Sequence, residues 1–133
     1  MFFMNDRVWS IWICRARSNL ARAKHGKFSE DVLYEDLAFD AQQAAEKSLK
    51  ALLLYLGMDA PRTHSIGYLL KLIEDGSKMA IPPHVQEAAV LSDYAVTTRY
   101  PGNYEAVSEE EYLRAVELAD DVCSWVMSII RQC

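Results

Sequence analysis

Two polar segments of the sequence lie beside predicted helix ends and carry side chains that could hold a phosphate group. The first spans residues 61–65 and contains Thr63 and His64. Thr63 or Ser65 can cap the helix that follows, and free backbone amides at such a position can bind an anion. Capping alone, with His64 on the surface or bonded to the backbone, is the competing interpretation.

The second polar segment spans residues 97–104. Arg99 falls in the last turn of a predicted helix, and its guanidinium donors suit phosphate. Tyr100 and Tyr104 offer ring faces on which a base could stack. Alternatively, Arg99 only bonds the last carbonyls of its own helix and favours its dipole.

A third candidate is Lys47, which precedes Ser48 of a predicted helix seam, so its ammonium could reach a groove between helices. A solvated helix face is the alternative. Nearby, Glu46 and Lys50 form an i,i+4 pair, worth only about 0.2–0.5 kcal/mol on a helix surface.

No metal or cofactor is expected. The sequence contains neither an E-x-x-H nor an H-E-x-x-H motif, and it has no glycine-rich phosphate loop. Its three cysteines form no C-x-x-C motif. Cys14 and Cys123 lie in apolar runs and are predicted to be buried thiols in a reducing, cytoplasmic environment.

Composition favours one globular domain over residues 1–133, with 51% hydrophobic residues and a net charge of −5. Such a charge argues against coating nucleic acid by bulk electrostatics. The stretch 7–29 is nevertheless basic and free of acidic residues, whereas 105–121 is acidic. Either the two stretches pair as helices, or the first forms a functional basic face. No apolar run is long enough for a membrane span. The apolar start carries Asp6 and Arg7 and shows no small-residue cleavage site, so no signal peptide is expected.

Apolar residues recur at three- and four-residue spacing, which predicts helices near 5–24, 30–56 and 65–75, from Pro82 to before Pro101, and from Ser108 onward. Ser29 is the predicted N-cap of the second helix, Gly76 the end of the third, and Ser108 with Glu111 a capping box for the last. The predicted fold is all-α, an antiparallel up-and-down four-helix bundle with one additional short helix. A second apolar stripe, Leu49, Leu53 and Leu56, predicts contact with the third helix or with another subunit.

The motifs A-x-x-A-A-E-K-x-L-K-A-L-L-x-x-x-G over 41–57, R-T-H-S over 62–65 and R-Y-P over 99–101 together resemble the HEPN (higher eukaryotes and prokaryotes nucleotide-binding) domain family. The resemblance covers about residues 35–130. It implies the same bundle, usually as a homodimer. It also implies a link to minimal nucleotidyltransferases, beside which such proteins serve as substrate-binding subunit or toxin-antitoxin partner.

Other members of the family are metal-independent ribonucleases, in which an Arg is followed by four to six residues and then a His. Arg99 matches the Arg, but Tyr104, Glu105 and Ala106 occupy the places where the His should stand. The sequence is therefore predicted to be a nucleotide-binding protein, for an ATP-like nucleotide or RNA, that works with a nucleotidyltransferase. Its predicted binding residues are Arg99, Tyr100, His64, Thr63, Lys47 and Tyr104. The alternatives are a ribonuclease with a degenerate motif, with Arg99 as its catalytic residue, and a purely structural dimeric scaffold.

Overall fold

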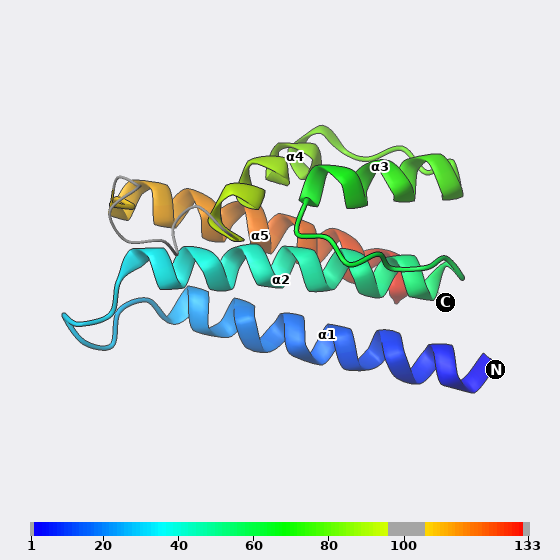
Figure 1. The fold of residues 1–133 in the computed structure, drawn as a ribbon, viewed down its shortest axis with the longest axis horizontal. Helices are drawn as coiled ribbons and strands as arrows, with labels where there is room; N and C mark the ends of the chain where they lie inside the picture. The colour runs from blue at the N-terminus through cyan, green and yellow to red at the C-terminus, as the bar shows by residue number, and fades with distance from the viewer. Residues whose placement is uncertain (1, 96–105, 132–133) are drawn as a thin grey trace.

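The computed structural model describes residues 2–95 and 106–131, apart from the side chains of residues 2–7. All the regular elements in these ranges are helical. In chain order they are α1 (Phe2–His25), α2 (Tyr34–Tyr55), α3 (Ile66–Ser77), α4 (Pro83–Gln86), the 3-10 helix η1 (Glu87–Ala95) and α5 (Glu109–Ile130). Figure 1 shows that α2 and α5 run in one direction, whereas α1 and the α4–η1 segment run in the other. These four rods form the predicted up-and-down bundle, and α3 is the additional helix.

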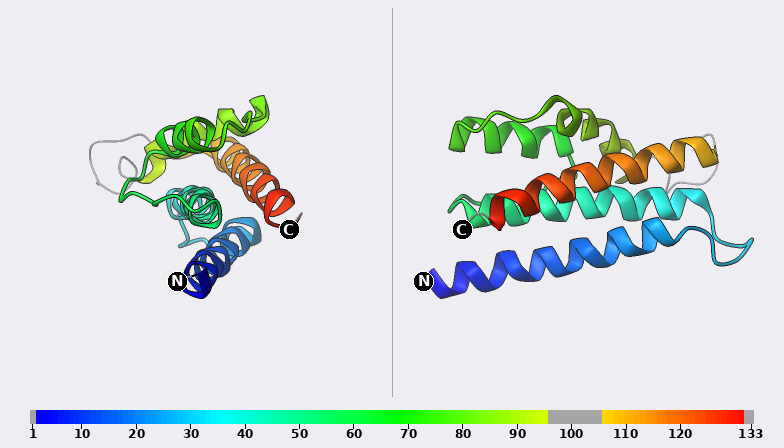
Figure 2. Two further views of the ribbon diagram at one scale, coloured as in Figure 1. Left: turned by 90° about the vertical axis from the view of Figure 1, so that its right-hand side faces the viewer. Right: turned by 180° about the vertical axis from the view of Figure 1, so that it is seen from behind.

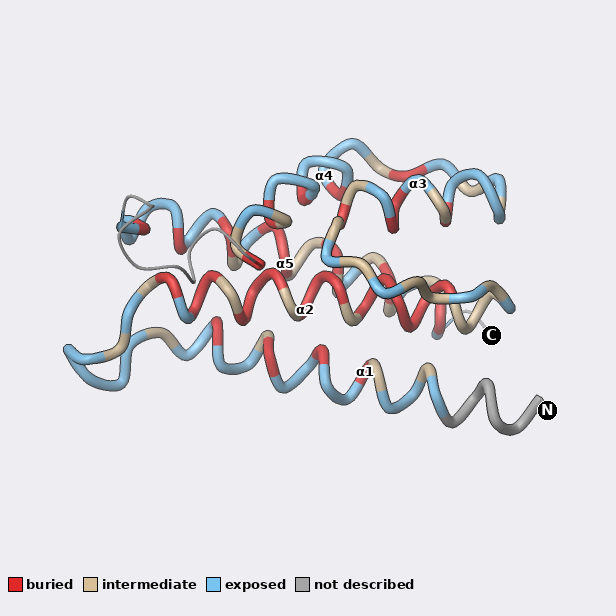
Figure 3. Tube along the Cα trace, viewed as in Figure 1, coloured by how far each residue is buried: buried red, intermediate tan, exposed pale blue. Residues whose placement is uncertain are grey.

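The helix α2 lies at the centre of the molecule, between α1, α5 and α3 (Figure 2). The trace in Figure 3 is accordingly buried along most of α2, whereas α1 is buried along one edge only. Leu49 and Leu53 belong to a core that they share with Leu69 and Ile73 of α3. The second apolar stripe therefore packs within the single chain, as one of its two interpretations predicted, while Leu56 is only half-buried.

Two predicted helix boundaries were wrong. The helix α2 begins at Tyr34 and not at Glu30, because the Ser29 hydroxyl and carbonyl accept hydrogen bonds from Asp31 N and Val32 N and close a local turn instead. Gly76 does not end α3. That helix continues to Ser77 and is terminated by Lys78, whose φ of 61° places it in the left-handed region.

The predicted fourth helix starts at the proline pair, with Pro82 at the N-cap and Pro83 in the first turn, but it is α-helical for one turn only. It continues as the 3-10 helix η1, in which Ala88 and Leu91 are buried three residues apart. Ser92, predicted for the apolar stripe, is half-buried and accepts a hydrogen bond from Ile66 N at 2.8 Å. The predicted end of this helix before Pro101 lies outside the described residues.

Two serine caps were predicted correctly. The Ser65 hydroxyl accepts from Tyr68 N at the start of α3, and the Ser108 hydroxyl accepts from Glu111 N at the start of α5. The Glu111 carboxylate accepts from the Tyr94 hydroxyl of η1, so it links two elements. Each cap fixes the point at which a helix enters the bundle.

The cysteine prediction was half wrong. Cys14 is exposed, because it falls on the solvent side of α1 beside the buried Ile13. Cys123 is half-buried, and its Sγ lies between the Ser48 hydroxyl and the Ala44 carbonyl of α2. No helix of the described residues is long and apolar enough to cross a membrane.

Candidate functional site

His64 is the predicted site residue that the fold presents most clearly. The loop after α2 runs back along that helix before α3 begins (Figure 1), and it brings His64 beside Glu46. The His64 Nδ1 atom lies 2.9 Å from Glu46 Oε1. The Glu46 side chain is only 5% exposed, whereas that of His64 is 63% exposed. The imidazole is thus anchored on its inner edge and open to solvent on the other.

Glu46 is held by several donors. Its carboxylate also accepts from Gln42 Nε2 at 3.0 Å and from Lys50 Nζ at 3.0 Å. Burial alone would raise the pKa of Glu46, but the hydrogen bonds from Gln42, His64 and Lys50 and the charge of Lys50 outweigh it and hold this pKa below its ordinary value. Glu46 is therefore a carboxylate at neutral pH.

An ionised carboxylate can only accept hydrogen bonds, so His64 must carry a proton on Nδ1. The second ring nitrogen, Nε2, is then an acceptor in the neutral ring and a donor in the imidazolium. A histidine fixed in this way can donate to a phosphate oxygen or exchange a proton with a ligand. The predicted alternative for His64, a purely surface or backbone-bonded ring, does not describe this contact.

The turn that contains Thr63 is occupied by its own hydrogen bonds. The Thr63 hydroxyl accepts a hydrogen bond from Ser65 N, and the Ser65 hydroxyl accepts one from Tyr68 N. The Ser92 hydroxyl accepts a hydrogen bond from Ile66 N. These three amides already have partners, which favours the capping interpretation of Thr63 and Ser65 over a cradle of free amides. The groups of this turn that remain open to a ligand include the exposed side chains of His64 and Arg62.

Lys47 lies on the other flank of α2, towards α1. Its Nζ donates to the Asn19 side-chain oxygen at 2.8 Å, and the Asn19 amide nitrogen donates to Asp40 at 2.9 Å. Burial lowers the pKa of Lys47, and so do the charges of Arg15 and Arg22. Lys47 therefore contacts α1, whereas Glu46, about 100° around α2 from Lys47, contacts His64.

Arg99, Tyr100 and Tyr104 lie outside the described residues, so their placement stays a prediction.

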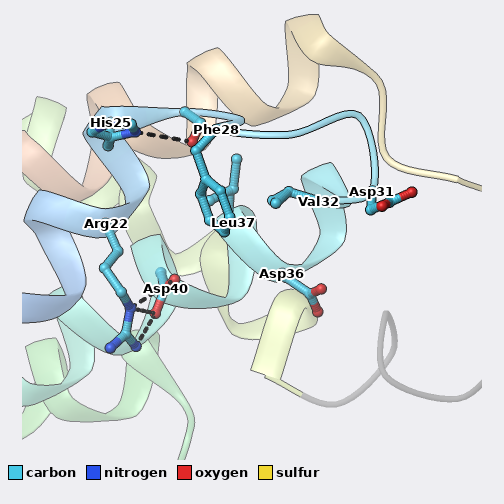
Figure 4. A pocket seen from close by; sticks show the side chains of 9 residues that line it. Arg22, His25, Phe28, Asp31, Val32, Asp36, Leu37 and Asp40 are labelled. Atoms are coloured by element: carbon cyan, nitrogen blue, oxygen red, sulfur yellow. Dashed lines mark hydrogen bonds and ion pairs between the residues drawn. The ribbon is translucent and has the colours of Figure 1, made fainter.

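A cavity of about 530 Å³ lies at the turn between α1 and α2, and none of the predicted site residues lines it. Figure 4 shows the paired side chains of Arg22 and Asp40 among the residues that line this cavity, and Phe28 beside Leu37. The Arg22 guanidinium donates to Asp40 through both Nε and Nη2, the shorter contact being 2.6 Å. This pair fastens α1 to α2 and leaves a mostly apolar hollow.

Among the described residues, no group of His, Cys, Asp and Glu side chains could hold a metal ion. Sequence reasoning missed the roles of Glu46, Asp40 and Asn19. A signal existed, because polar residues recur at three- and four-residue steps along α2. They are Asp40, Gln43, Lys47 and Lys50. A polar stripe on an otherwise buried helix marks a seam with partners.

Comparisons with known proteins agree with this architecture. The model of the HEPN domain matches residues 9–130. The crystal structure of TT1696 from Thermus thermophilus is similar with a TM-score of 0.78 and 33% identity, over 90% of this chain and 96% of that one. The crystal structure of ST0689, described as an archaeal HEPN homologue, is similar with a TM-score of 0.72 and 29% identity, over 92% of this chain and 97% of that one. The comparison with curated proteins gave no match. The family model covers most of the chain, and the protein therefore belongs to the HEPN domain family.

Proposed function

We propose that this HEPN protein binds the phosphate of a nucleotide through His64, as the nucleotide-binding partner of a minimal nucleotidyltransferase. The observation that carries the proposal is the anchored imidazole. Its Nδ1 is 2.9 Å from a buried carboxylate while most of the side chain faces solvent. Holding the ring in one orientation avoids the entropy cost of ordering it when a ligand arrives.

The remaining predicted contacts extend this site. Arg99 would supply a bidentate donor pair to the same phosphates, and Tyr100 and Tyr104 a stacking surface for the base. The partnership, the homodimer and the nucleotide specificity follow from membership of the family and belong to the proposal.

Isothermal titration calorimetry with ATP tests the His64 site. The His64→Gln variant should bind about tenfold more weakly, because a hydrogen bond to a charged group contributes about 1.5–3 kcal/mol. The matched control is His84→Gln, since His84 is exposed on α4 and far from Glu46 in the sequence. Equal affinities for wild type and His64→Gln would remove His64 from the site.

A second experiment tests the partner. The tagged protein should retain a nucleotidyltransferase in stoichiometric amount when it is purified from its native host, as mass spectrometry of the eluate would report. Recovery of the tagged chain with no nucleotidyltransferase would contradict the partnership. Incubating the pure protein with RNA would then decide whether it cleaves RNA in spite of the missing histidine.

A further inference from the structure

The seam between α1 and α2 holds more positive than negative charge on the face that carries Lys47. On α1, Arg15, Asn19 and Arg22 are spaced by four and three residues and so share one side of the helix. Asn19 and Arg22 contact the α2 stripe through Lys47 and Asp40 respectively. The two helices therefore present their polar stripes to each other.

The charge count of this seam is unbalanced. Arg15, Arg22 and Lys47 contribute three positive charges, and Asp40 contributes one negative charge. The negative charge of Glu46 also acts on Lys47 and raises its pKa, but the Lys50 ammonium balances this charge at 3.0 Å. The seam thus keeps a surplus of two positive charges, the difference between three and one. Among the described residues, Arg15 has no ion pair within salt-bridge distance.

The seam is also rigid. The Asn19 residue is only 4% exposed, and its amide group accepts from Lys47 while it donates to Asp40. Asp40 in turn accepts a hydrogen bond from the Arg22 guanidinium. Burial, together with the charges of Arg15 and Arg22, lowers the pKa of Lys47, so these cations are close enough to repel one another. An anion between them would relieve that repulsion.

We propose that the cations of this seam, Arg15, Arg22 and Lys47, bind a phosphate group, and that His64 binds another phosphate of the same ligand. Consecutive residues of α2, Lys47 and Glu46, carry the two contacts, and they project about 100° apart around the helix. On a helix about 10 Å in diameter two such points are several ångströms apart, so the ligand must carry more than one phosphate. The inference rests on the proposed function, because it extends the His64 site.

Either the triphosphate of ATP or the backbone of a single-stranded RNA could supply these phosphates. Fluorescence anisotropy with a short labelled oligoadenylate, and competition of that probe by ATP, separate the two sources. Tight oligoadenylate binding that ATP displaces poorly assigns the seam to an RNA backbone. Equal displacement by ATP assigns it to the triphosphate. Either result supports phosphate binding by the seam only if the measured binding is weakened by replacing Arg15.

The chain offers a matched control on the same helix. Arg17 is exposed like Arg15, but it lines the groove between α1 and α5 together with Asp120 and Cys123. Replacing either arginine removes the same charge from the same helix. A difference between the two variants therefore reports the site and not the overall charge of the protein.

The Arg15→Gln variant should bind the probe about tenfold more weakly at low salt. The plot of log affinity against log salt concentration should become less steep by about 0.7, which is the change expected for one lost phosphate contact on a single strand. The Arg17→Gln variant should change affinity by less than about twofold, and Arg15→Lys should retain most of the binding. Thermal unfolding followed by circular dichroism checks that each variant is folded. Lys47→Gln, which can still donate to Asn19, provides a second removal of charge.

The outcomes distinguish the proposed phosphate site in the seam from the proposed site at His64. Equal losses in Arg15→Gln and Arg17→Gln, or no loss in Arg15→Gln, overturn the seam site. If His64→Gln loses binding while Arg15→Gln keeps it, the proposed function stands without the seam. If Arg15→Gln loses binding while His64→Gln keeps it, the seam stands and the His64 site falls. A folded wild type that binds neither probe overturns both.

Discussion

Replacing Glu46 by Gln should destabilise the protein far more than replacing an exposed glutamate. The Glu46 and Lys50 side chains are only 5% and 9% exposed, and their charged atoms are 3.0 Å apart. The substitution keeps the shape of the side chain but removes its charge, so it leaves the Lys50 ammonium buried beside an amide.

The magnitude follows from the partners that the variant loses and keeps. Breaking a buried ion pair by removing one partner costs about 3–5 kcal/mol. The amide oxygen of the variant can still accept from Gln42 and His64, and the Lys50 ammonium keeps its place 5.6 Å from the centre of the Trp12 ring. We therefore expect a loss of about 2–4 kcal/mol in the free energy of unfolding and a fall of about 10 °C in Tm.

Urea unfolding followed by circular dichroism measures this loss. The control is Glu117→Gln, because Glu117 is 64% exposed in its ion pair with Arg114 and should contribute less than about 1 kcal/mol. In a double-mutant cycle with Lys50→Met, the coupling energy should be about 1–3 kcal/mol. Equal stabilities of Glu46→Gln and Glu117→Gln, or no coupling to Lys50, would refute the reasoning.

The same pair predicts the direction of an acid effect. The pKa of Glu46 in the folded protein lies below its ordinary value of 4.5. A group with a lowered pKa contributes its full stabilisation above the unfolded pKa and loses it as the pH falls through the folded pKa. Wild-type stability should therefore decline below about pH 4.5 more steeply than that of Glu46→Gln. Parallel pH curves for the two proteins would contradict this expectation.

Three further predictions test other parts of the structure. Burial raises the pKa of Cys123 to about 11. In a Cys133→Ser background at pH 8, iodoacetamide should therefore alkylate Cys123 at least about 100-fold more slowly than the exposed Cys14. Equal alkylation rates by mass spectrometry would contradict the burial of Cys123. Ser65→Ala should cost about 1 kcal/mol in urea unfolding through loss of the α3 cap, and an unchanged midpoint would argue against that cap. Gly67→Ala should raise Tm, because replacing glycine by alanine stabilises a helix by up to about 1 kcal/mol. The added Cβ would lie 3.5 Å from Ala89 Cβ, which is an ordinary contact distance. A lower Tm would mean that this contact is too tight.

The helices could be predicted because their signals are local. A three-four apolar rhythm and a capping serine act over a few residues, so Ser65 and Ser108 were placed correctly. Where local signals compete, prediction failed. Ser29 is as good a turn former as it is an N-cap, and its hydrogen bond from Asp31 N delays the start of α2. The change from α4 to η1 depends on packing against α2, α3 and α5, which the sequence does not express locally.

A residue of the candidate site could be predicted from the sequence, but the side chain that it contacts could not. His64 was identified because it lies in a polar segment beside a helix start and in the R-T-H-S motif that resembles the HEPN family. Its anchor, Glu46, is 18 residues away, and only the return of the loop along α2 brings the two together. The i,i+4 pair of Glu46 and Lys50 was predicted as a weak surface contact. Its burial is a property of the folded chain, because the Trp12 ring of α1 lies over Lys50.

The polar stripe of α2 has an energetic cost that helps to interpret it. An apolar stripe of similar volume would pack as well or better, since buried ion pairs are often no more stabilising than the hydrophobic residues that could replace them. On one flank the cost is offset, because Glu46 satisfies Lys50, Gln42 and His64 together. On the other flank Asp40 faces Arg22 and, through Asn19, Lys47, so positive charge is left over. The proposed anionic ligand would be bound by that surplus. Removing the surplus at Arg15 should therefore cost binding and leave stability unchanged, which is the opposite of the pattern expected for Glu46.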